Sequence, residues 1–126
     1  MYLKLIYHDK KTEEICTNIK KATKLFGGNK DMAMSLFARL NALAMADTIN
    51  DIRVQPQFHF HKLTNKGKNK NYDGYFAIYV KGRINKWRII IQPLNDEELP
   101  FEPCNIDLIS CKVKIVEIKE VSNHYE

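Results

Sequence analysis

The chain has 126 residues, 44% of them hydrophobic, which is enough for one domain with a single modest core. Its net charge of +5 permits nucleic-acid contact without demonstrating it. Cys16, Cys104 and Cys111 lack zinc-type spacing, and this odd, sparse set favours reduced thiols over a disulfide framework. No signal peptide or membrane-length apolar run is seen, so we expect a cytoplasmic protein without membrane contact.

The first part of the chain is predicted to form a strand and two helices. Alternation over residues 2–7 indicates the strand. Asp9 is the expected N-cap of the first helix, which should end at the glycine pair 27–28. Asp31 can cap a second helix with an apolar stripe over residues 32–44. The simplest interpretation is that both helices cover one side of a sheet.

A connector with a short helical turn is expected over residues 47–57, followed by the run FHFHKL at 58–63. Period-2 alternation predicts that the two phenylalanines point to the core and that His59 and His61 share the opposite face. Residues 62–72 follow as a cationic loop, because lysines alternate there with asparagine and glycine. The surface lysines of this loop are Lys62, Lys66, Lys68 and Lys70.

Residues 75–92 are predicted to be a β-hairpin. Gly82 and Asn85 tolerate the positive φ of a tight reversal between the two strands. Arg88 lies within the most apolar strand, on the face opposite Ile89 and Ile91. Because an unpaired buried charge is costly, its guanidinium should face water or an anion. It is therefore either a solvated charge or a cation aimed at a phosphate.

Residues 94–107 are expected to be an irregular acidic loop, since prolines interrupt them, and the last strand is predicted over 113–121. The order β-α-α-β-β-β predicts a single α+β domain, with two helices packed on one face of an antiparallel sheet. The other face should carry Arg88 and one of His59 and His61. The chain should pass this face on its way to His124.

These side chains match the needs of metal-free RNA cleavage. The 2′-hydroxyl attacks its own 3′-phosphate, so a base, an acid and a charge-stabilising cation are required. His61, His124 and Arg88 could supply them, and Tyr72, Tyr75 and Tyr79 could stack on bases. Three other interpretations remain open: a generic basic binding domain, histidines without a role, and a zinc site formed by His59, His61 and His124.

Three segments carry a family resemblance: FHKL at 60–63, YFAIYVKGRINKWRIIIQP at 75–93 and VEIKEVSNHY at 116–125. Their order and spacing resemble the HigB branch of the RelE/ParE toxin superfamily, over nearly the whole chain. The resemblance implies a RelE-like fold and a ribosome-dependent endoribonuclease that cuts messenger RNA without metal or other cofactor. It also implies neutralisation by a HigA-like helix-turn-helix antitoxin, through which alone the toxin would reach operator DNA.

The resemblance places the family's catalytic side chains on His61, Arg88 and His124, with RNA held by further residues. The implied RNA-binding residues are Lys62, Lys66, Lys68, Lys70 and Tyr125. Two positions depart from the family pattern: Ser122-Asn123 replace an Asp-Tyr pair before the terminal histidine, and Thr64 stands where a lysine follows the H-x-L segment.

Two other functions within the same superfamily stay open. The first is a non-enzymatic poison of a protein target such as DNA gyrase, as ParE-type members are. Because that class lacks the histidine pair, His61 and His124 discriminate against it. The second is a corepressor that binds the antitoxin and has no nuclease activity.

Overall fold

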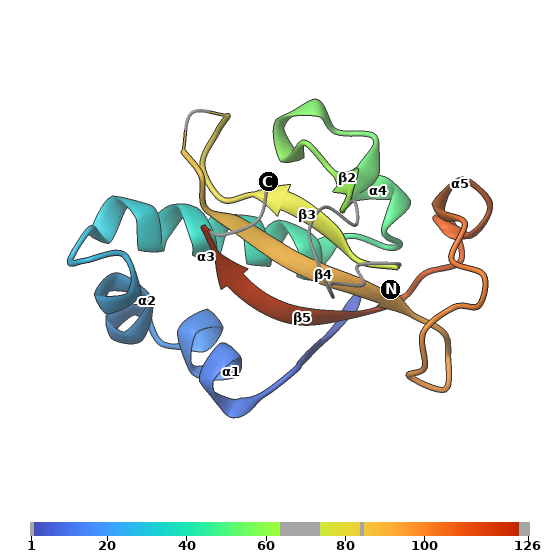
Figure 1. The fold of residues 1–126 in the computed structure, drawn as a ribbon, viewed down its shortest axis with the longest axis horizontal. Coiled ribbons are helices and arrows are strands. Elements are labelled where there is room, and N and C mark those ends of the chain that lie inside the picture. The colour runs from blue at the N-terminus through green and yellow to red at the C-terminus, as the bar shows by residue number, and fades with distance from the viewer. Residues whose placement is uncertain (1, 64–73, 84, 124–126) are drawn as a thin grey trace, which may run out of the picture.

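The computed structural model describes residues 2–63, 74–83 and 85–123, and shows an α+β fold (Figure 1). Its elements in chain order are β1 (Lys4–Tyr7), α1 (Lys10–Thr17), α2 (Ile19–Leu25), α3 (Lys30–Met45), α4 (Asn50–Arg53), the 3₁₀ helix η1 (Pro56–Phe58), β2 (His61–Lys62), β3 (Phe76–Tyr79), β4 (Arg88–Leu94), α5 (Ile106–Ile109) and β5 (Ile115–Ser122). No helix in this described part is long and apolar enough to cross a membrane.

The strands form one mixed sheet in the order β1-β5-β4-β3-β2. β1 and β5 run parallel, while every other neighbouring pair is antiparallel (Figure 1). The prediction of an antiparallel sheet is therefore wrong at this edge. A parallel pair needs a long crossover, which the chain between the first and last strands supplies. The five strands in the described residues also exceed the four in the predicted order.

The helices cover one face of the sheet, as predicted. Leu36 of α3 and Cys16 of α1 share the main core with Ile89, Ile91 and other inward residues of the sheet. Residues 88 and 90 alternate with these isoleucines, so they face away from the helices. Ile90 accordingly belongs to a separate small cluster. Of the predicted site residues that the structure describes, His61 and Arg88 lie on this second, helix-free face.

Three helices, not two, occupy the segment before the connector. Asn18 adopts an extended conformation, with φ −127° and ψ 113°, and ends α1. Its Oδ1 accepts hydrogen bonds from the backbone N–H groups of Lys20 and Lys21 at 2.9 and 3.3 Å. The side chain thus caps α2, and the predicted single helix is divided because asparagine competes with the helical backbone for hydrogen bonds.

The predicted helix ends are partly confirmed. Asp9 caps α1 by accepting the Thr12 N–H at 2.8 Å, which lowers the pKa of Asp9. Gly27 and Gly28 have φ of 66° and 91° and follow the end of α2, as predicted. The expected cap of α3 is wrong, since Asn29 instead of Asp31 accepts the Met32 N–H at 3.1 Å.

Replacing Asn18 with alanine should lower the free energy of unfolding by about 1 kcal/mol, because two N–H groups of α2 lose their acceptor. Asn18→Ser is the control, since serine keeps a capping oxygen. Urea unfolding of both variants measures the difference. Equal stability of the alanine and serine variants would contradict a capping role for Asn18.

Three predictions, for one strand, one turn and one loop, differ from the observed backbone conformation or bounds. The run 58–63 is a strand only at His61–Lys62, because residues 56–58 form η1 and His59 has a φ of 49°. Gly82 and Asn85 are absent from the described residues with positive φ, so that turn expectation is wrong. Of the acidic loop 94–107, Leu94 belongs to β4 and the last two residues to α5. Residues 64–72 of the cationic loop lie outside the described residues.

Candidate functional site

Strand register gathers four side chains on the helix-free face. Tyr79 of β3 pairs with Arg88 of β4, and His61 of β2 pairs with Ala77 of β3. Directly paired residues point to the same face of a sheet. His59, just before β2, also reaches the Tyr79 ring. We call His59, His61, Tyr79 and Arg88 the Tyr79 cluster.

Arg88 is buried, with 4% of its surface exposed, so the expectation of a solvated charge is wrong. Its Nη1 donates hydrogen bonds to the backbone carbonyls of Asn85 and, at 2.9 Å, Trp87. The guanidinium carbon lies 3.6 Å from the centre of the Tyr79 ring. Carbonyl acceptors and the ring face offset the cost of removing the charge from water. The hairpin loop thus holds the arginine in place.

The two histidines contact the same tyrosine in different ways. The His59 ring stacks on Tyr79 at 4.3 Å between ring centres, and the His61 ring meets it edge-on at 5.9 Å. Nδ1 of His61 lies 2.6 Å from the carbonyl oxygen of His59. Because a carbonyl only accepts, Nδ1 carries the proton, and Nε2 of a neutral His61 is an acceptor. This Nε2 is buried.

The predicted site residues are only partly brought together. His61 and Arg88 both contact Tyr79, whereas Lys62 is exposed and lines a separate pocket. Ser122, the last residue of β5, pairs with Arg88, so the chain leaves the sheet beside the Tyr79 cluster. The remaining predicted site residues lie outside the described residues: His124, Tyr125, Lys66, Lys68 and Lys70.

No three His, Cys, Asp or Glu side chains in the described residues come together to hold a metal ion. The zinc interpretation requires His124 together with His59 and His61. Since His124 falls outside the described ranges, that interpretation is untested.

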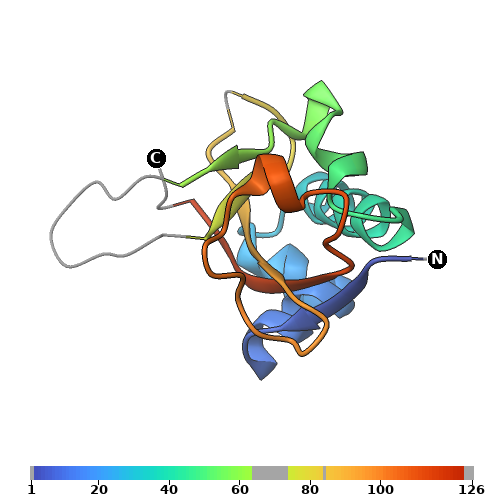
Figure 2. The same cartoon turned by 90° about the vertical axis from the view of Figure 1, so that its right-hand side faces the viewer.

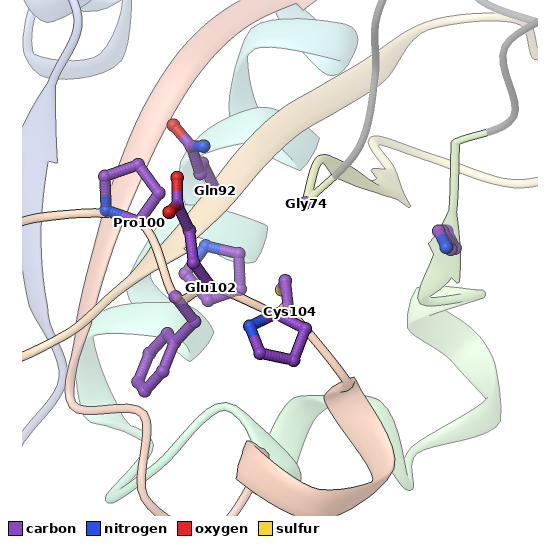
Figure 3. A pocket seen from close by; sticks show the side chains of 9 residues that line it. Gly74, Gln92, Pro100, Glu102 and Cys104 are labelled. Atoms are coloured by element: carbon purple, nitrogen blue, oxygen red, sulfur yellow. The ribbon is translucent and has the colours of Figure 1, made fainter.

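A pocket of about 590 Å³ opens at the other end of β4 (Figure 3). Residues from the end of that strand and from the acidic loop line it, and these two segments lie at the same end of the molecule as α5 (Figures 1 and 2). Its lining residues are Lys62, Gly74, Gln92, Pro93, Pro100, Phe101, Glu102, Pro103 and Cys104. We call this the β4-end pocket.

Gln92 is the buried polar side chain of the β4-end pocket. The residue is 8% exposed, and its carboxamide, which forms no hydrogen bond with the described residues, is not among their fully buried unpaired groups. Gly74 has a φ of 82°, and a Cβ there would lie 3.8 Å from Nε2 of Gln92. Burial raises the pKa of the Cys104 thiol, an effect that the positive charge of Lys62 opposes.

The β4-end pocket is not predicted from the sequence, because the charge and the prolines of the acidic loop indicate only an irregular segment. The available signal was Gln92, an amide within the otherwise apolar run RIIIQPL of β4. An amide on a central strand needs a partner, which makes it a candidate ligand contact. The other residues that line the pocket are far apart in the sequence. Only the folded structure shows that they come together.

Comparisons with known proteins identify no relative. The chain matches no protein-family model, and neither the search of curated proteins nor the search of solved structures finds a match.

Proposed function

We propose that this protein is a HigB-like toxin with a RelE-like fold, which cuts ribosome-bound messenger RNA in the cytoplasm without a metal. The observation that carries the proposal is the placement of His61 and Arg88 around Tyr79, beside the strand that leads toward His124. The sequence resemblance and the basic net charge support the same function. A helix-turn-helix antitoxin is the proposed neutralising partner.

The proposed reaction divides the work among three side chains. His61 suits the base, because its anchored Nδ1–H leaves Nε2 able to accept the proton of the 2′-hydroxyl. The 2′-oxygen then bonds to phosphorus while the bond to the 5′-oxygen breaks. His124 would protonate the leaving oxygen, and Arg88 would stabilise the phosphate charge. The products are a 2′,3′-cyclic phosphate and a 5′-hydroxyl.

The reaction requires access to groups that are covered in this conformation. Arg88 and Nε2 of His61 are both buried. RNA or the ribosome must therefore displace the groups that cover them before a phosphate can bind. Catalytic contacts commonly tighten only in the substrate complex, so this requirement is compatible with the proposed roles.

Replacing the 2′-hydroxyl of the scissile nucleotide with hydrogen should abolish cleavage, because the nucleophile is removed. Primer extension on a messenger bound to purified ribosomes, with and without the substitution, provides the measurement. A chelator should leave cleavage of the unmodified messenger intact. Cleavage of the deoxy-substituted messenger, or strict dependence on added zinc or magnesium, would contradict the mechanism.

The second candidate is a non-enzymatic poison of a protein target. Burial of Arg88 against backbone carbonyls favours it, because these contacts also describe an arginine that only stabilises the hairpin. Induced expression separates the candidates: growth arrest with intact transcripts supports the poison, and cut transcripts support the nuclease. If induced expression causes neither growth arrest nor cut transcripts, the result supports the corepressor function.

A further inference from the structure

The β4-end pocket contains a polar side chain that forms no hydrogen bond with the described residues. Gln92 is 8% exposed and lines the pocket, yet its carboxamide is bonded to none of them. The carboxamide N and O atoms are not among the fully buried unpaired atoms of the described residues, so they are open to water from the pocket. A ligand that displaces this water has to replace its hydrogen bonds. In Figure 3, the side chains of Gln92 and Glu102 extend into the space between the strand and the loop. A ligand entering this space would supply hydrogen-bonding partners to both.

The polar lining has a defined pattern of donors and acceptors. The Glu102 carboxylate only accepts, the Lys62 ammonium only donates, and the Gln92 carboxamide does both. A guanine base presents two adjacent donors, N1–H and the N2 amino group, next to the acceptor O6. The carboxylate can take both donors while the carboxamide or the ammonium donates to O6. Charge-assisted, paired hydrogen bonds of this kind are among the strongest in proteins.

The other bases fit this pattern less well. Adenine and cytosine place a ring-nitrogen acceptor where guanine has N1–H, so the carboxylate would face a lone pair. Uracil has a single N–H between two carbonyls and offers no paired donors. Pro100, Phe101 and Pro103 add apolar walls against which a flat base can pack. The missing side chain of Gly74 keeps space beside Gln92.

We propose that the β4-end pocket binds a guanine base of the RNA substrate, a role that rests on the proposed nuclease function. Gln92 and Arg88 lie on the same face of β4, four residues apart, which is about 13 Å along a strand. A single RNA strand lying on the helix-free face would therefore reach both. The pocket would select the position of the cut by holding a guanine at a fixed distance from the scissile phosphate.

Protection of Cys104 tests the pocket without any cleavage. Cys104 lines the pocket, whereas Cys111 is exposed elsewhere and serves as the control within the same chain. Guanosine monophosphate at about ten times its Kd should slow iodoacetamide alkylation of Cys104 by about tenfold, because only the unliganded fraction of the protein reacts. Adenosine, cytidine and uridine monophosphates should protect far less at the same concentration. Equal protection by all four nucleotides, or none by guanosine monophosphate, would overturn the proposal.

Two variants test the contacts themselves. Glu102→Gln should weaken guanosine monophosphate binding about tenfold or more, because the paired acceptor is lost. Gln92→Leu should weaken binding and retain the fold, because it replaces a buried, unbonded amide with an apolar side chain. Glu97→Gln, in the same loop and outside the lining, is the matched control. Unchanged affinity in Glu102→Gln would overturn the proposal even if Gln92→Leu failed to fold.

The binding test and the cleavage test fail separately. A protein that binds guanosine monophosphate in the pocket and cuts no RNA would overturn the nuclease alone. A protein that cuts RNA while guanosine monophosphate leaves Cys104 unprotected would overturn the guanine pocket alone. If both results are positive, Glu102→Gln should cut RNA with its preference for guanine reduced about tenfold or more.

Discussion

Replacing Arg88 with alanine is expected to lower the free energy of unfolding by about 2–4 kcal/mol, a large part of the stability of a domain of this size. The change empties a site that is 4% exposed, removes the contact with the Tyr79 ring and leaves two backbone carbonyls without their donor. A solvated Arg88, which strand alternation alone suggests, would instead leave the stability almost unchanged when replaced.

Thermal and urea unfolding of Arg88→Ala, Arg88→Lys and Arg83→Ala would measure this effect. Arg83 is exposed in the same hairpin loop, so its replacement should change stability by no more than about 0.5 kcal/mol. Lysine keeps the charge and loses the planar guanidinium, so Arg88→Lys should fall between the two. Wild-type stability of Arg88→Ala would mean that these contacts contribute little. Cleavage should be compared per folded molecule, because an unfolded variant is also inactive.

Replacing His61 with alanine should reduce the rate of RNA cleavage by about 10² or more, because the proposed proton acceptor is removed. Ribosome binding should fall much less, since one half-buried ring supplies little of a contact surface. His8→Ala is the matched control, because His8 is an exposed histidine at the end of β1. Single-turnover cleavage and ribosome sedimentation of the two variants give the comparison.

Three results of the His61 experiment lead to different conclusions. Loss of cleavage in a folded, ribosome-binding variant supports the nuclease. Growth inhibition that survives in His61→Ala, without cut transcripts, supports a poison of a protein target. Loss of folding would show that His61, through its contacts with Tyr79 and the His59 carbonyl, is mainly structural.

Local sequence patterns determined much of the secondary structure. Alternation placed the first and last strands close to their observed bounds, and it put Arg88 on the face opposite Ile89. Asp9 and the glycine pair 27–28 marked helix ends correctly. These signals succeed because side-chain periodicity and capping act within a few residues of the chain.

Some local predictions failed because a neighbouring interaction was stronger than the pattern. The sequence pattern predicts Asn18 within a helix, yet its side chain accepts hydrogen bonds from the backbone that follows and divides that helix. Alternation predicts His59 in a strand, yet its backbone is left-handed and it follows a 3₁₀ helix. Asparagine and histidine adopt such conformations more readily than most residues.

Only the tertiary structure decided the sheet order, the burial of Arg88 and the existence of the β4-end pocket. The pairing of β1 with β5 joins the two ends of the chain, and no local pattern encodes it. Arg88 could be buried because the hairpin loop turned two carbonyls toward it. The pocket combines Gln92 with residues from the acidic loop and from either side of residues 64–73. Burial and convergence depend on contacts between distant segments, which the periodicity of one segment does not record.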